Sequence, residues 1–281
     1  MGVEEAAATI REHAAEGRTI RPRGGGTKLS WLAGNEAVDL DTRGLNRILE
    51  HNQGDFTAVL EAGVPLVGAQ ATFARAGQML ALDPPLGEGD AATLGGVIAT
   101  NDSGPLRHRF GGVRDLVVGI TVVLSDGTVA QSGGKVIKNV AGYDLAKLFA
   151  GSYGTLGLIA RVAVRLHPAP AATATVAGTS TDPDRLAAAA AALARLPLEA
   201  DCLDVAFQDG SGRVLLRFGG AAAAQQAEAA AGRVEGLDDV EVLTADDDLW
   251  AHRRAAQRAP LVVKVSGRPT DLPAVLRAAQ A

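Results

Sequence analysis

The chain has 281 residues, of which 47% are hydrophobic and 21% charged, as in ordinary soluble globular proteins. Its formal net charge of −5 gives no general attraction to nucleic acid or anionic lipid, so no nucleic-acid partner is expected. The single cysteine, Cys202, excludes a disulfide within the chain. One thiol is also too few for an iron–sulfur cluster, which needs about four thiolates.

The N-terminus and the apolar runs show no sign of a targeting or membrane segment. The first residues are acidic where a secretory signal is basic, and no apolar stretch follows them. No run reaches the roughly 18 consecutive apolar residues of a membrane span. We therefore expect a cytoplasmic protein that reaches the inner membrane only through partners.

The first part of the chain alternates short helix and strand patterns, as in an α+β domain. A β-branched run and the turn signal at 125–128 predict a hairpin in its second half. In chain order, we predict a helix over 3–16, strands over 18–22 and 38–41, a helical turn over 45–51, extended segments over 56–62 and 64–66, a helix within 67–80 that ends near Gly77, strands over 117–124 and 129–132, a helix over 144–150 and a strand over 158–166.

Two prolines, Pro168 and Pro170, break regular structure and predict a boundary between domains 1–168 and 171–281. Beyond them the order βαββαβ is that of a ferredoxin-like domain. Its first helix begins with Asp182 as a plausible N-cap and Pro183 in the first turn. Residues after 247 resemble the start of a second such unit, so we expect a domain that is incomplete at its C-terminus.

Four glycine-rich segments are the strongest functional signal, at 21–28, 84–89, 93–104 and 151–157. Glycine lets backbone N–H groups approach a ligand closely, and successive amides can form an anion-binding concavity. Several such segments in one domain indicate a long phosphorylated ligand that is held at many points by backbone.

Their order and spacing resemble the FAD-binding domain of the vanillyl-alcohol oxidase and p-cresol methylhydroxylase type. The string KNVAGYDL at 138–145 is similar to the FAD-linked 2-hydroxy-acid oxidases, above all the FAD-binding subunits of bacterial glycolate oxidases. The resemblance implies a two-lobed α+β FAD-binding domain followed by a ferredoxin-like α+β cap domain at the substrate. It also implies FAD as the cofactor and a small hydroxy acid as the substrate.

The candidate FAD-binding residues lie in these glycine segments and in one later strand. The first segment would surround the pyrophosphate with amides and one hydroxyl, although an exposed turn explains it too. The second offers threonine, asparagine and serine side chains, with a turn of small buried residues as the alternative. The candidates are Arg23, Gly24, Gly25, Gly26, Thr27, Lys28, Pro84, Thr93, Leu94, Gly95, Gly96, Thr100, Asn101, Ser103, Gly104, Gly157 and Ile159.

Competing nucleotide motifs are absent, and the FAD is expected to be non-covalent. Neither the Walker spacing nor a G-x-G-x-x-G after a strand occurs, which disfavours a P-loop or nicotinamide site. Relatives with covalent FAD commonly carry a histidine in the first glycine loop. No histidine stands between Arg23 and Lys28.

Lys138, Asn139 and Tyr143 are the candidate catalytic residues. A cation near the flavin N1–C2=O edge would stabilise the reduced ring, and Asn139 or Tyr143 could bind a ring edge or the substrate. The alternative is a structural role, in which these side chains only form hydrogen bonds with nearby backbone groups. Arg107 and Arg109 could pair with a substrate carboxylate, although ordinary surface positions explain them as well.

The five histidines lack the spacing of metal ligands, so no metal is expected. Related 2-hydroxy-acid dehydrogenases use histidines and an acid around a divalent ion, and this set is missing. The resemblance therefore implies a flavoprotein that works with a larger FAD-linked subunit and an iron–sulfur subunit. A self-sufficient FAD-linked oxidase and a non-catalytic assembly subunit are the alternatives.

Overall fold

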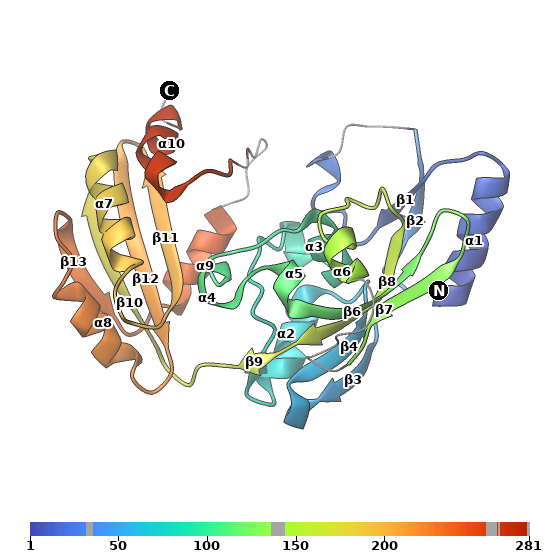
Figure 1. Ribbon diagram of the computed structural model, residues 1–281, viewed down its shortest axis with the longest axis horizontal. Coiled ribbons are helices and arrows are strands. Elements are labelled where there is room, and N and C mark those ends of the chain that lie inside the picture. The colour runs from blue at the N-terminus through green and yellow to red at the C-terminus, as the bar shows by residue number, and fades with distance from the viewer. Residues whose placement is uncertain (32–35, 136–143, 257–262, 264, 280–281) are drawn as a thin grey trace. The chain divides into compact units, whose positions relative to one another are not determined.

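The computed structural model describes residues 1–31, 36–135, 144–256, 263 and 265–279. They fall into two compact units, shown in Figure 1. The first unit is Met1–Gly104 with Gly111–Ala169, and the second is Pro105–Phe110 with Pro170–Ala281.

The first lobe of the first unit is built from helix α1 (Val3–Ala15) and two parallel strands, β1 (Ile20–Arg23) and β2 (Val38–Asp41). The helix begins with a capping contact, since the Gly2 N–H donates to Glu5 Oε2 at 3.1 Å. Its apolar face is buried with the ends of two strands of the second lobe. Ile20, the first residue of β1, packs against the same cluster.

The second lobe is a five-stranded antiparallel sheet in the order β3-β4-β8-β6-β7. Its strands are β3 (Ile48–Asn52), β4 (Thr57–Glu61), β6 (Val117–Val123), β7 (Val129–Gly133) and β8 (Leu158–Arg165). The central strands β6 and β8 are largely buried, as expected for apolar, β-branched runs. The other elements of this unit are α2 (Leu66–Ala74), β5 (Gln78–Met79), α3 (Leu94–Thr100), α5 (Val113–Leu116), α6 (Leu145–Phe149) and β9 (His167–Pro168), with short 3-10 turns at Leu29–Trp31, Gln53–Asp55 and Glu88–Asp90.

Two sequence-based expectations for this unit were wrong. Residues 48–52 form strand β3 and not a helical turn, because they pair with β4. The helix expected within 67–80 ends at Ala74 and not near Gly77, and Gly77 at φ +66° turns the chain into β5. Within the glycine segment 93–104, residues 94–100 form helix α3, with Thr93 as its N-cap.

The second unit has the ferredoxin-like topology that the sequence predicts. Its sheet has the order β11-β12-β10-β13, and all neighbouring strands are antiparallel. Its elements are β10 (Thr173–Ser180), α7 (Pro183–Leu193), β11 (Ala200–Gln208), β12 (Ser211–Gly219), α8 (Ala223–Ala231), β13 (Asp238–Leu243), α9 (Asp247–Ala256), a 3-10 turn (Pro269–Asp271), α10 (Leu272–Ala278) and the short helix α4 (Arg107–Phe110).

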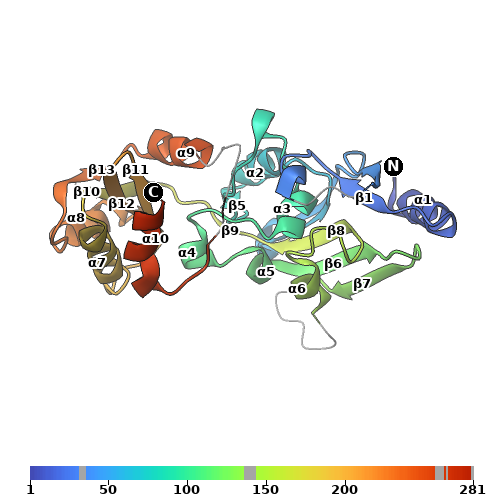
Figure 2. The same cartoon turned by 90° about the horizontal axis from the view of Figure 1, so that it is seen from above.

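Helices cover both faces of this sheet, as Figure 2 shows. Helices α7 and α8 pack on one face over a core that includes Leu186, Leu216 and Phe218. On the other face Trp250 of α9 is buried against Cys202 and Leu215. The alternation of inward and outward residues along each strand thus produces two separate apolar layers.

Candidate functional site

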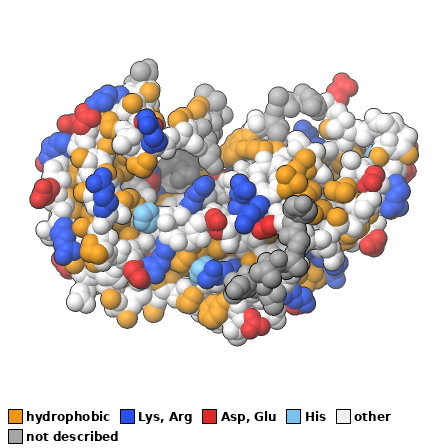
Figure 3. Space-filling view, in the orientation of Figure 1, with side chains coloured by type: hydrophobic (Ala, Val, Ile, Leu, Met, Phe, Trp, Pro, Cys, Tyr) orange, Lys and Arg blue, Asp and Glu red, His pale blue; other side chains and the backbone are white. Residues whose placement is uncertain are grey.

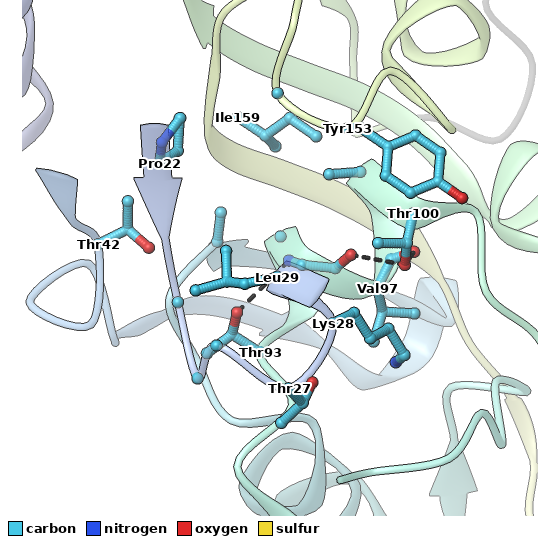
Figure 4. Close-up of a pocket in the computed structure, with 18 of the residues that line it drawn as sticks. Pro22, Thr27, Lys28, Leu29, Thr42, Thr93, Val97, Thr100, Tyr153 and Ile159 are labelled. Carbon is cyan, nitrogen blue, oxygen red and sulfur yellow. Dashed lines mark hydrogen bonds between the residues drawn. The ribbon is translucent and has the colours of Figure 1, made fainter. Parts of the chain in front are cut away.

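A pocket in the first unit brings three of the glycine segments together. About 800 Å³ of space lies between its walls, part of it open to solvent. Its walls come from the end of β1 with the following loop, from helix α3, and from the turn into β8 (Figure 4). The predicted residues that line it are Gly24, Gly25, Gly26, Thr27, Lys28, Thr93, Gly95, Gly96, Thr100, Gly157 and Ile159.

The loop of residues 24–28, here called the phosphate loop, supplies backbone donors to this pocket. Among the described residues, the N–H groups of Gly25, Gly26, Thr27 and Lys28 donate no hydrogen bond within the protein. Gly26 has φ +72°, and such a left-handed residue among ordinary ones lets consecutive N–H groups converge on an anion. The Thr27 hydroxyl lies in the same wall and adds a donor.

The glycines at 24 and 25 are required by the protein's own packing. A Cβ on Gly25 would lie 1.7 Å from the Ala91 carbonyl oxygen, and one on Gly24 would lie 2.1 Å from Thr93 Oγ1. Both distances are far below van der Waals contact, so only glycine lets the loop lie this close to segment 91–93. Close contact between the two loops therefore requires glycine at both positions, and the predicted approach of their amides to a ligand stays a prediction.

Helix α3 forms the second wall, and its own first amides are already used. Gly95 N–H donates to the Ala62 carbonyl at 2.7 Å, and Gly96 N–H donates to Thr93 Oγ1 at 3.4 Å. The Thr100 hydroxyl donates back to the Gly96 carbonyl at 2.9 Å, and dashed lines in Figure 4 mark both contacts of Gly96. This wall therefore offers small side chains and shape, while the phosphate loop offers the free amides.

The third wall is the turn that precedes β8. Tyr153 has φ +54°, and its N–H donates to the Ala99 carbonyl at 2.8 Å, which ties the turn to the end of α3. The Tyr153 ring lies on the side of Thr100 in Figure 4. Gly157, at φ +139°, then leads into Leu158 and Ile159 at the start of β8.

Several predicted residues lie elsewhere. Arg23 points to Asp39 and is 52% exposed, and Leu94 is buried in the core. Pro84, Asn101, Ser103 and Gly104 do not line the pocket, although their loops flank it. Lys138, Asn139 and Tyr143 lie outside the described residues. Arg109 contacts its own unit, with its Nη2 2.9 Å from Glu199 Oε2.

The pocket also has walls that sequence reasoning did not single out. Arg21, Gly154 and Tyr153 stand inside glycine segments, which is a signal that could have found them. The apolar lining residues carry no motif and look like any core residue. The additional lining residues are Arg21, Pro22, Leu29, Thr42, Ala62, Ala92, Val97, Ala99, Tyr153, Gly154 and Leu158.

The two arginines beside the phosphate loop share one aspartate partner. Arg21 Nε donates to Asp39 Oδ1 at 2.7 Å and Arg23 Nη1 to Asp39 Oδ2 at 3.1 Å. The hydrogen bond from Arg21 holds the pKa of Asp39 below its ordinary value, with a further contribution from Arg23. Positive and negative side chains are interspersed on the face of the molecule in Figure 3. Backbone amides are thus the groups of this pocket that are most available to bind a phosphate.

These residues fit an FAD. Free consecutive amides beside a hydroxyl suit a pyrophosphate, and the apolar walls suit flat rings. Over the described part of the chain, no cluster of three or more metal-ligating side chains occurs. Likewise, no helix among the described residues is long and apolar enough to cross a membrane.

Comparisons with known proteins agree with this site. Residues 2–133 match the family model described as FAD binding domain. The chain is 40% identical over 131 residues to glycolate oxidase subunit GlcE of Escherichia coli (strain K12), covering 47% of this chain and 37% of that protein. It is 37% identical over 153 residues to glycolate oxidase subunit GlcD of Bacillus subtilis (strain 168), covering 54% of this chain and 32% of that protein.

A third relative and a solved structure extend the match. The chain is 34% identical over 170 residues to the D-2-hydroxyglutarate dehydrogenase of Xanthomonas citri pv. viticola, covering 60% of this chain and 36% of that protein. The matched stretch therefore spans about a third of these relatives. An alkyldihydroxyacetonephosphate synthase has the same fold, with a TM-score of 0.72 and 19% identity over 90% of this chain and 52% of its own. Residues 2–133 of this chain are thus similar to the FAD binding domain family.

Proposed function

We propose that this chain is the FAD-binding subunit of a glycolate oxidase complex, which oxidises glycolate or a related 2-hydroxy acid to the 2-oxo acid. The observation that carries the proposal is the phosphate loop, whose free amides line a pocket within the stretch that matches the FAD binding domain model. The D-2-hydroxyglutarate dehydrogenase relative supports a hydroxy acid as the substrate class.

The residues of the pocket would bind and orient the cofactor. Gly25, Gly26 and Thr27 would hold the pyrophosphate, while Val97 and Ile159 would pack on the rest of the ligand. Bound FAD supplies an acceptor for the two electrons that leave the hydroxyl-bearing carbon. No histidine occurs in the phosphate loop, so we propose a dissociable, non-covalent FAD.

Three further parts of the proposal concern catalysis, partners and location. Lys138, Asn139 and Tyr143 stay the candidate residues at the flavin edge. A larger FAD-linked subunit and an iron–sulfur subunit would complete the complex, because this chain has one cysteine and cannot hold a cluster alone. The complex would lie in the cytoplasm, peripheral to the inner membrane.

The first experiment tests the cofactor. Denaturation of the purified protein in acid should release a yellow supernatant that contains FAD. Flavin that stays with the precipitated polypeptide would contradict non-covalent binding, and absence of flavin after reconstitution would favour an assembly role.

The second experiment tests the reaction. The flavin spectrum is recorded anaerobically before and after glycolate, with the chain alone and with its partner subunits. We expect bleaching to be slow or absent alone and rapid in the complex. Equally rapid bleaching of the isolated chain would favour a self-sufficient oxidase.

A further inference from the structure

Lys28 is the one cation of the phosphate loop, and its ammonium group is bound by the protein. Nζ lies 2.9 Å from Asp102 Oδ2 and donates to the Pro85 carbonyl at 3.1 Å. The two side chains are only 9% and 10% exposed. Its Nζ also lies 5.8 Å from the centre of the Trp31 ring.

We propose that the buried Lys28–Asp102 ion pair is a positioning device that holds the phosphate loop in the shape that presents its amides. Lys28 thus acts on the loop and not on the phosphate charge. The inference rests on the proposed function in one respect, namely that the pocket binds the pyrophosphate of FAD.

The ion pair and the hydrogen bond from Lys28 to Pro85 together join three segments of the chain. Lys28 ends the phosphate loop, Pro85 belongs to the segment after β5, and Asp102 follows helix α3. The segments are also in close contact beside the pair, because a Cβ on Gly87 would lie 2.3 Å from Thr27 Cγ2. A shift of Lys28 would therefore move Thr27 and the amides next to it.

The electrostatics favour positioning over direct neutralisation. A carboxylate oxygen at 2.9 Å neutralises the ammonium group, and one of its N–H donors is already bonded to the Pro85 carbonyl. Removal of either partner of such a buried pair leaves the other charge without compensation, which is strongly destabilising. The amides of the loop carry no competing bonds among the described residues and remain for the phosphate.

A double-mutant cycle on the full-length protein separates the two roles. The variants are Lys28→Met, which keeps the aliphatic stem, Asp102→Asn, which keeps an oxygen for the Ser103 N–H at 2.9 Å, and the double variant. Lys147→Met is the matched control. Lys147 is an exposed helix residue whose Nζ also forms an ion pair, 3.3 Å from Asp144 Oδ2. The dissociation constants of FAD and of ADP are measured by fluorescence quenching and competition, and the urea midpoint of each apoprotein is measured beside them.

If the pair positions the loop, each single variant should bind FAD and ADP about tenfold more weakly or worse, and the double variant should be about as weak as the single ones, because each change already breaks the same pair. Lys147→Met should match the wild type. Tighter binding in Asp102→Asn, with Lys28→Met and the double variant equally weak, would show that Lys28 is a phosphate ligand and overturn the inference.

A purely structural pair is excluded by comparison of the two readouts. If the apoprotein midpoints fall while the folded variants bind FAD and ADP like the wild type, the positioning role is wrong. Failure of the proposed function has a different signature, because the wild type itself would then bind neither ligand.

Discussion

At the scale of single residues, Asp246 is the most heavily bonded acid of the second unit. It accepts hydrogen bonds from Thr173 at 2.7 Å and from Arg217 at 2.8 Å and 3.0 Å, and Thr175 bonds to it as well. Trp250 donates its indole N–H to Thr175 at 2.9 Å. Burial acts to raise the pKa of Asp246, but these hydrogen bonds outweigh it and hold the pKa below the ordinary value of 3.8.

We predict that Asp246→Asn destabilises the second unit by about 3 kcal/mol, because it leaves the Arg217 charge buried and sets an amide donor against it. A lowered pKa in the folded state gives stability that is present above pH 3.8 and is lost as the pH falls through the lower folded value. The difference between wild type and variant should therefore shrink below about pH 4. Urea unfolding followed by tryptophan fluorescence measures both effects.

The exposed pair Arg185–Asp238, at 3.2 Å with side chains 43% and 61% exposed, is the control for this variant. Asp238→Asn should change the unfolding free energy within experimental error, as surface pairs contribute little. A loss of the same size in both variants would remove the special role of the buried network.

Gly25 gives a second prediction at this scale. Gly25→Ala places a Cβ 1.7 Å from the Ala91 carbonyl, so the phosphate loop must move away from segment 91–93 and its amides move with it. We expect FAD affinity to fall about tenfold or more, by the same reasoning that a misplaced binding group loses its contacts. Titration of the apoprotein with FAD measures this loss.

Gly68→Ala is the matched control, because its Cβ would meet nothing within 4 Å and the residue lies in helix α2. Alanine there should leave FAD binding unchanged and raise the stability by roughly 0.5–1 kcal/mol. Unaltered FAD affinity in Gly25→Ala would show that close contact with Ala91 is not needed for binding.

At the scale of elements, helix α7 shows how a local signal fixes a boundary. Asp182 Oδ1 accepts from the Asp184 N–H at 2.8 Å, and Pro183 occupies the first turn, as the sequence predicts. Asp182→Ala should lower the unfolding free energy by about 1 kcal/mol, and Asp182→Ser should recover most of it because serine also caps well. Equal losses in the two variants would mean that the cap bond does not stabilise the helix.

The same scale separates what the sequence could predict from what it could not. The hairpins, the ferredoxin-like order and the convergence of glycine segments follow from local patterns and a resemblance. Strand β3 was mistaken for a helical turn because its pairing with β4 overrides a short, ambiguous pattern. The role of Lys28 could not be read from its loop, since its partner Asp102 is 74 residues away in the chain.

At the scale of the whole molecule, each of the two units has its own hydrophobic core, and the candidate site lies in only one unit. All residues that line the pocket belong to the first unit. The cores of α7, α8 and α9 belong to the second unit. A ligand that binds only the folded form stabilises it in proportion to its excess over the dissociation constant.

We therefore predict that FAD at about a hundredfold excess over its dissociation constant stabilises the first unit by about 2.7 kcal/mol and leaves the second unchanged. Hydrogen exchange followed by mass spectrometry measures the stability of both units, with peptides from β8 (Leu158–Arg165) for the first and from β12 (Ser211–Gly219) for the second. Exchange in β8 should slow by about a hundredfold where it requires unfolding of the unit, and exchange in β12 should stay as it is. Equal slowing of both strands would show that the two units unfold together, and no slowing of either would place the FAD site outside this pocket.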